Sequence, residues 1–457
     1  MTTTVGVSPG PVTPVPAVRR AWWRPRLDGA TTPARLRLLL ALLILLSLAW
    51  GVLAALTADQ HASAAADVVA VSEPLSLDAE QIYTSLSDAD ATAANAFLAG
   101  GLEPAKARQR YQADITQAAI RIEAASALVG SSAARTQLPG HLTKQASAAG
   151  TAVGDDLAIL SGQLPAYTDE VGTARADNRL GLPLGAAYLR EASGLLRGTL
   201  LPAASDIYIR ESTLLTSASA QATGLPLIVI AAIAGLGLGY VLFRSSRWLS
   251  RHTHRVVNYG LLLAALAGLV SLVWLVAAFV LGRGDLLHAQ QQGSAPAQAF
   301  ARAEVAALQA HADESITLID NGGDDAYQKD YVAQQKILGP GPGTLLAAVQ
   351  AAGGPGSDVA AQARAWYKAH AALRAKDNAG SHADAVRSAL TGDAATRFAS
   401  LSATLSDGVD AHQAVFASSA RNGRDAFTGL AVGMIVASLV MVVGCAWGLS
   451  RRLAEYR

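Results

Sequence analysis

Four long apolar stretches without a charged residue constrain this chain more than any other feature. They cover about residues 38–57, 225–243, 259–281 and 427–449, and none contains Asp, Glu, Lys, Arg or His. Each reaches the roughly 20 apolar residues that a helix needs to cross a hydrocarbon core about 30 Å thick. Ionisable groups inside a membrane usually mark ion or proton pathways. The stretches therefore predict four membrane helices and argue against an ion-coupled transporter.

The chain also repeats one pattern twice. Ser47–Leu56 reads SLAWGVLAAL and Ser271–Val280 reads SLVWLVAAFV, and each lies in an apolar run that leads into Ala-rich polar sequence. Further on, Tyr167–Asn178 and Tyr367–Asn378 both begin with Tyr and end in Asp-Asn at the same spacing. Because these similarities occur in the same order, they indicate an internal duplication of membrane helix, large polar segment and membrane helix.

The Arg residues near the apolar stretches predict how the chain crosses the membrane. They precede the first stretch, occupy the short link between the second and third, and follow the fourth: Arg19, Arg20, Arg24, Arg26, Arg35, Arg37; Arg244, Arg247, Arg251, Arg255; Arg451, Arg452, Arg457. By contrast, no Lys or Arg occurs between Thr57 and Lys106. The positive-inside rule then places both termini and the link in the cytoplasm, and both large segments outside. We expect the first stretch to remain as an uncleaved anchor.

Both large segments are predicted to be helical, because they are rich in Ala, Leu, Gln, Arg and Glu and are interrupted by Gly and Pro at intervals of about 25–40 residues. In the first, a seam with alternating steps of four and three is typical of a helix bundle: Tyr111, Ile115, Ala118, Ile122, Ala125, Val129. Four helices for each segment, packed antiparallel, return both ends to the membrane. Pro74 and Pro202 lie within these helices and predict kinks that either accommodate bundle curvature or act as hinges. The sequence thus predicts an all-α integral membrane protein with four transmembrane helices and two tandem extracytoplasmic four-helix bundles.

The resulting division of the chain has nine parts. They are a cytoplasmic Arg/Pro-rich tail (1–37), the first span (38–57), the first bundle (58–222), the second span (223–243), a cytoplasmic basic link (244–258), the third span (259–281), the second bundle (282–424), the fourth span (425–449) and a cytoplasmic tail (450–457). The only cysteine, Cys445, lies in the fourth span, so both bundles must be held together by packing without disulfides.

Two resemblances follow from this layout. The bundles resemble the four-helix sensor modules of chemoreceptors, which is a likeness of architecture alone. More specifically, the Arg/Trp-rich stretch Arg19–Arg26, the LLALLILLSLAWG entry into the first span, and Asn178–Gly181 with Leu189–Ser193 resemble actinobacterial four-pass membrane proteins of the GlnX type. That resemblance covers the layout of essentially the whole chain. It implies a transducer that works with a glutamate-binding lipoprotein and reports its amino-acid-loaded state to a soluble cytoplasmic serine/threonine kinase.

Two sets of residues are candidate contact sites. The first comprises the repeated groups Tyr167, Asp177, Asn178 and Tyr367, Asp377, Asn378. They predict either a polar surface for a ligand or partner at one tip of each bundle, or simple helix ends, because Asp and Asn bond to the local backbone. The second set is Arg244, Arg247, Trp248, Arg251 and Arg255. These residues predict contact with either a cytoplasmic partner or anionic lipid.

We find no HExxH, GxSxG or Walker A motif and no Cys/His cluster with metal-ligand spacing, and we expect neither catalysis nor a cofactor. The leading hypothesis is therefore a non-enzymatic transducer in the cell membrane. Its expected partners are membrane lipid, an extracytoplasmic solute-binding lipoprotein and a cytoplasmic kinase, with no nucleic acid; oligomers are compatible with this. Two alternatives stay open: a structural scaffold or accessory subunit of an envelope or transport complex, and direct sensing of a small molecule by a bundle.

Overall fold

The computed structural model describes residues 32–67, 69–70, 73–101, 103–135, 143–253, 258–321, 325–353 and 358–454. In these ranges the chain forms helices joined by short turns and contains no strand. The helices are α1 (Thr32–Asp67), α2 (Glu73–Leu98), α3 (Ala105–Arg135), α4 (Thr143–Arg179), α5 (Leu184–Leu195), η2 (Leu196–Leu200), α6 (Leu201–Ala222), α7 (Pro226–Thr253), α8 (Tyr259–His288), η3 (Ala289–Ser294), α9 (Ala295–Asp320), α10 (Ala326–Leu338), α11 (Leu345–Ala352), α12 (Val359–Asn378), α13 (His382–Thr391), α14 (Asp393–Ala426) and α15 (Leu430–Ala454).

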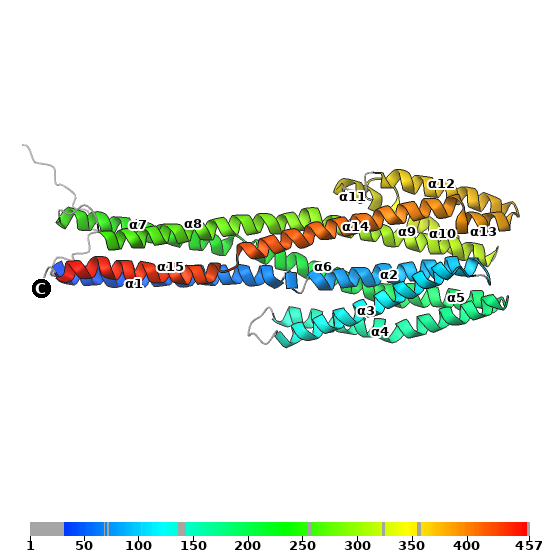
Figure 1. The fold of residues 1–457 in the computed structure, drawn as a ribbon, viewed down its shortest axis with the longest axis horizontal. Helices are drawn as coiled ribbons and strands as arrows, with labels where there is room; N and C mark the ends of the chain where they lie inside the picture. Colours follow the sequence, from blue (N-terminus) through cyan, green and yellow to red (C-terminus); the bar gives the residue numbers. More distant parts are fainter. Residues whose placement is uncertain are drawn as a thin grey trace, which may run out of the picture.

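Four helices, α1, α7, α8 and α15, contain segments long and apolar enough to cross a membrane. They lie together at one end of an elongated molecule, and all the other helices extend from them in the same direction (Figure 1). The prediction of an all-α membrane protein with four membrane-crossing helices is confirmed. Several of these helices continue past the predicted spans; α1, for example, extends to Asp67.

Glycines let α8 and α15 pack closely. A Cβ atom on Gly260 would lie 2.4 Å from the backbone nitrogen of Gly448 and 2.5 Å from the carbonyl oxygen of Gly444. Such contact through small residues is typical of membrane helices, which gain little from hydrophobic burial against each other. Asn258 adds a polar tie, because its Nδ2 donates a hydrogen bond to the Gly448 carbonyl at 2.9 Å. Its Oδ1 caps the first turn of α8 by accepting from the Gly260 N–H at 3.1 Å.

The first helical unit, α2 to α6, has one continuous apolar core. Of the predicted seam, Tyr111, Ala118, Ile122 and Ala125 are buried in this core. Ile115 and Val129 pack against it. Two turns of this unit fall at glycines with positive φ: Gly100 (φ 72°), after α2, and Gly181 (φ 69°), after α4. Left-handed backbone of this kind is readily adopted only by glycine among the common residues.

The second helical unit, α9 to α14, has more helices than the four predicted. Phe300, Tyr331 and Trp366 are fully buried at its centre. A turn before Leu345 separates two short helices, α10 and α11, and Gly392 separates α13 from α14. A Cβ atom on Gly392 would lie 2.7 Å from the Cα of Ser388. The tight turn at this position therefore needs a glycine, and it is one reason why this unit has more than four helices.

The two units join along α2 and α9, which run side by side through the middle of the molecule (Figure 1). Their cores interlock at this junction. Ala91 of α2 belongs to the core of the second unit, and Ile319 of α9 packs against the core of the first. The two units therefore form one body, and the α2–α9 interface is shared by both.

Prolines accompany π-helical turns at three places. Residues 69–70 precede Pro74, η2 precedes Pro202, and η3 precedes Pro296. A proline inside a helix removes one hydrogen bond to the carbonyl four residues earlier and crowds that carbonyl, which a wider turn can relieve. For Pro296 this carbonyl belongs to Gln292, and the Nδ1 atom of His412 lies 2.8 Å from it. His412 thus supplies the hydrogen bond that the proline cannot.

Candidate functional site

The structure separates the six residues predicted at the bundle tips. Tyr167 is fully buried in the core of the first unit, with its ring centroid 6.5 Å from that of Tyr111. Tyr367 is half-buried beside Trp366. Neither tyrosine belongs to an exposed tip, because each lies on the inward-facing side of its helix. Their large rings make them packing residues of the two cores.

The Asp-Asn pairs do lie where helices end. Asn178 donates a hydrogen bond from Nδ2 to the Phe97 carbonyl at 2.8 Å, which ties the end of α4 to the end of α2. Asp377 accepts hydrogen bonds from Arg374 at 2.5 Å and from His382 Nδ1 at 2.7 Å. Asn378 is exposed next to this turn. The Asp377 contacts are local, and the Asn178 bond joins two helix ends within the first unit, so both pairs favour the helix-end interpretation.

The residues of the basic link are described in part. Arg244 and Arg247 are exposed on α7, and Trp248 packs against the membrane-helix core. Arg251 lies in the last turn of α7, although its side chain is outside the described part. Arg255 falls outside the described residues altogether.

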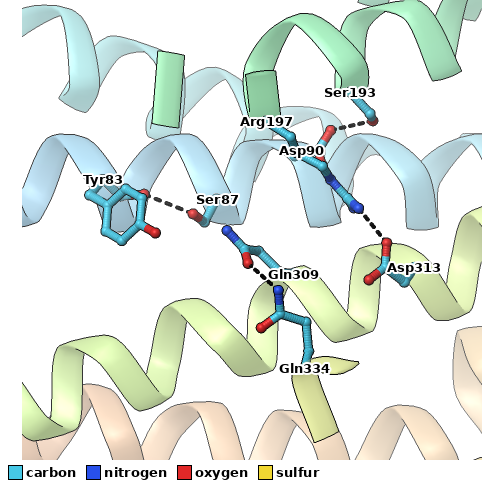
Figure 2. Close-up of polar contacts among 8 residues, drawn as sticks. All are labelled: Tyr83, Ser87, Asp90, Ser193, Arg197, Gln309, Asp313 and Gln334. Carbon is cyan, nitrogen blue, oxygen red and sulfur yellow. Dashed lines mark hydrogen bonds and ion pairs between the residues drawn. The ribbon is translucent and has the colours of Figure 1, made fainter. Parts of the chain in front are cut away.

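A buried ionic network at the α2–α9 interface stands out instead. Arg197, in the π-helical turn η2, donates a hydrogen bond to Asp313 of α9 and lies 3.5 Å from the Asp90 carboxylate of α2. Ser193 donates to Asp90 at 2.6 Å. Figure 2 shows this arrangement, with Arg197 reaching from the first unit towards α9. One cation thus links both units, in surroundings where Asp313 is only 1% exposed.

Burial and charge make this network energetically expensive. Burial raises the pKa of Asp313 to about 7, although Arg197 acts in the opposite direction. Removing charges from water costs several kcal/mol per ion, and buried ion pairs recover this only with good geometry. Residues with strongly shifted pKa values cluster at functional sites. The network therefore marks the α2–α9 interface as the candidate functional region.

A second polar cluster is formed by the residues of α9 that flank Asp313 in sequence. His370 of α12 hydrogen-bonds to the fully buried Glu314 through Nδ1 at 2.6 Å, and the Nδ1 atom of His311 lies 3.5 Å from the same carboxylate. Burial alone would raise the pKa of Glu314, but the hydrogen bonds and charges of the two histidines outweigh it and hold the pKa at about 2. The ring of Tyr331 stacks on His370 with centroids 3.6 Å apart. Among the described residues, no group of His, Cys, Asp or Glu is placed to hold a metal ion. This cluster is therefore a hydrogen-bonded core element.

Two cavities flank the α2–α9 pair. One, of about 630 Å³, lies between α2, α3, α9 and α14 and is lined by charged, hydroxyl and apolar side chains. The other, of about 480 Å³, lies among α2, α6, α9 and α10 on a different side of the pair. Both volumes fall in the range of small-molecule sites, which often form between domains.

This interface is not predicted from the sequence, because acidic residues on helices are usually exposed to solvent. Asp90, Asp313 and Glu314 are buried instead. One signal was available: Ser87–Asp90 and His311–Glu314 both concentrate polar groups on stretches that are otherwise rich in alanine. Since the partner helix determines which face is covered, the pattern of one helix alone could not reveal the burial.

The comparisons with known proteins agree with a role in sensing. Residues 64–220 match the family model described as "Actinobacterial sensor domain". This supports an actinobacterial sensor membrane protein. The matched range begins at the end of α1 and includes α2 to α5 and nearly all of α6, so it corresponds to the first helical unit. No curated protein and no solved structure matches the chain.

Proposed function

We propose that this protein is a non-enzymatic transmembrane transducer. It relays an extracytoplasmic cue, in the form of an amino-acid-loaded binding protein, to a cytoplasmic partner such as a serine/threonine kinase. The observation that carries this proposal is one helical run from Tyr259 to Asp320, which continues for 62 residues from α8 through η3 into α9. At about 1.5 Å per residue it extends roughly 90 Å, far more than the thickness of a bilayer.

This run connects the α2–α9 interface directly to a membrane helix. Its outer part carries Asp313, which binds Arg197 of the first unit, and its inner part packs against α15. Packed helices switch by shifts of about 1–2 Å between alternative arrangements. A partner that docks on one unit and moves α2 against α9 would thus move α8 within the membrane.

The π-helical turn η3 gives this run a place to bend. Pro296 leaves the Gln292 carbonyl without its usual helical donor, and His412 of α14 supplies one. Because α14 leads into the membrane helix α15, this contact couples two elements that enter the membrane. We therefore assign the hinge role to η3 together with His412.

In this proposal, another protein reads the signal in the cytoplasm. Exposed Arg244 and Arg247 on α7 offer that partner a positively charged contact.

A pull-down of the full-length protein from detergent tests the proposal. Recovery of a solute-binding lipoprotein together with a kinase supports transduction. Recovery of cell-wall or permease components alone would contradict it and favour the scaffold alternative.

The basic link can be tested separately. Replacing Arg244, Arg247 and Arg251 with Gln should leave insertion intact, because the N-terminal arginines still bias the first span. Recovery of the kinase should fall. A matched variant with Arg19→Gln and Arg20→Gln removes basic charge elsewhere and should retain the kinase. If both variants recover the kinase equally well, the basic link does not contact the kinase and serves only to orient the membrane helices.

A further inference from the structure

The larger cavity beside the α2–α9 pair is built by both helical units. The first unit contributes α2 and α3, and the second contributes α9, α14 and the end of α13. Its volume of about 630 Å³ is sufficient for a small organic molecule. Phe398 forms part of its wall and is stacked on His311 with centroids 3.9 Å apart. A molecule in this cavity would therefore contact both units at once.

The charges that line the cavity are unevenly matched. Arg110 is already held by Asp88 through two hydrogen bonds of 2.9 Å. Lys106 is exposed at the rim. Asp114 and Glu304 also line the cavity, and burial together with the neighbouring Asp88 raises the pKa of Asp114 to about 7. The cavity thus holds more carboxylates than free cations, which disfavours an anionic ligand.

Glu304 is the least compensated of these groups. Its side chain comes from the middle of α9, and the residue is only 7% exposed. No described residue forms a hydrogen bond or ion pair with its carboxylate, although the side chain borders a polar cavity. Burial, followed by the charges of Asp88, Glu80 and Asp410, raises the pKa of Glu304 to about 8, against a smaller opposing effect of Arg110. A buried carboxylate without a partner is costly for the folded state.

We propose that this cavity binds a small organic ammonium ion, whose charged group pairs with Glu304 and Asp114 and whose apolar body lies against Phe398. A metal ion does not fit as the occupant, because the carboxylates of the described residues are not gathered into a metal-binding group. An ammonium ion needs only hydrogen-bond acceptors, and the cavity provides these from the two carboxylates and from the hydroxyls of Thr84, Ser85 and Ser402.

This inference goes beyond the proposed function, because it gives the chain a ligand of its own, whether or not a binding protein docks. The ligand would contact α3 of the first unit and α9 of the second at the same time. It would therefore bind at the interface that the proposed relay moves. Binding can be measured without any signalling partner. An experiment that refutes the relay would therefore not refute this binding site. Likewise, an experiment that refutes the binding site would not refute the relay.

The test uses the full-length protein in detergent and three probes of matched size: phenethylammonium, 2-phenylethanol and 3-phenylpropionate. Binding is measured by calorimetry and by the shift in melting temperature. We expect binding of the ammonium probe only, at matched ionic strength. No binding of phenethylammonium, or equal binding of the neutral alcohol, would overturn the proposal.

Three variants locate the site. Glu304→Gln keeps the shape but removes the charge, and should weaken the binding of phenethylammonium at least about tenfold, in line with the loss of a hydrogen bond to a charged group. Asp114→Asn should also weaken the binding of phenethylammonium. This variant replaces Glu304→Gln in the test if Glu304→Gln does not fold. Ala399→Trp places a bulky ring on an exposed position at the cavity wall and should block entry with all carboxylates in place.

The control variant is Glu123→Gln, which removes an exposed carboxylate from α3 outside the cavity. Its affinity for phenethylammonium should equal that of the wild type. If Glu304→Gln and Ala399→Trp also bind the probe as the wild type does, the probe occupies another site and the proposal is wrong.

Discussion

Removal of Arg197 should destabilise the protein strongly at neutral pH and much less in mild acid. In the Arg197→Gln variant, Asp90 and Asp313 remain buried but lose the cation that both of them contact. Breaking a buried ion pair by removing one partner costs about 3–5 kcal/mol. For a chain of 457 residues, a loss of that magnitude lowers the melting temperature by about 3–5 °C.

Proton binding limits this loss and gives it a pH dependence. Burial already raises the pKa of Asp313 to about 7, so this carboxyl takes up a proton readily once Arg197 is gone. Protonating an ordinary carboxyl at pH 7, about three units above its normal pKa, costs roughly 4 kcal/mol, and each unit of acidification lowers that cost by about 1.4 kcal/mol. The deficit of the variant should therefore fall to about 1–2 kcal/mol at pH 5.

The assay is thermal unfolding of the full-length protein in detergent at pH 7 and pH 5. Arg397→Gln is the matched control, because Arg397 pairs with Asp393 at 3.1 Å on an exposed face of α14 and should contribute at most about 0.5 kcal/mol. Combining Arg197→Gln with Asp90→Asn and Asp313→Asn should restore most of the loss at pH 7. A deficit that stays the same at pH 5, or that matches the control at pH 7, would refute the reasoning.

Three further predictions concern packing and titration. Gly408→Ala should lower stability by about 1–3 kcal/mol, because its Cβ would lie 2.1 Å from the Phe300 ring, whereas Gly172→Ala meets no atom and should raise the melting temperature. Since the folded-state pKa of Glu314 is about 2, wild type should lose roughly 3 kcal/mol as pH falls from about 4.5 to 2, and Glu314→Gln should lack this acid transition. Since the folded-state pKa of Glu304 is about 8, the wild type should lose stability as pH rises from about 4.5 to 8. The Glu304→Gln variant should be more stable than the wild type at pH 8, by at most roughly 5 kcal/mol. At about pH 4.5 the two proteins should be nearly equally stable. Melting temperatures measured across pH check all three, and parallel curves for a variant and the wild type would contradict the respective titration argument.

The helices of this protein could be predicted because their signals are local. The seam from Tyr111 to Val129 shows its buried face through its spacing alone, and the turn at Gly181 shows itself through a glycine after Asp-Asn. The four membrane helices follow from length and the lack of charge. Each of these features depends on residues that are close in sequence.

The candidate site could not be predicted in the same way, because it depends on which helices meet. Asp90 and Asp313 look like solvated residues until α2 and α9 pack together. The repeated spacing of Tyr167 and Asp-Asn suggests a polar contact site, yet the position of Tyr167 along α4 directs its side chain into the core. The π-helical turns had a usable signal in Pro202 and Pro296, but the donation from His412 to Gln292 joins residues far apart in sequence.

The proposed relay requires the two helical units to lie outside the cell and the basic link to lie inside. Labelling with a membrane-impermeant maleimide tests this directly in a Cys445→Ser background, which removes the only native thiol. Ser381→Cys, in the turn between α12 and α13, should react in intact cells. Ser250→Cys, near the end of α7, should react only after lysis. The opposite pattern would contradict the relay of an external cue towards a cytoplasmic partner.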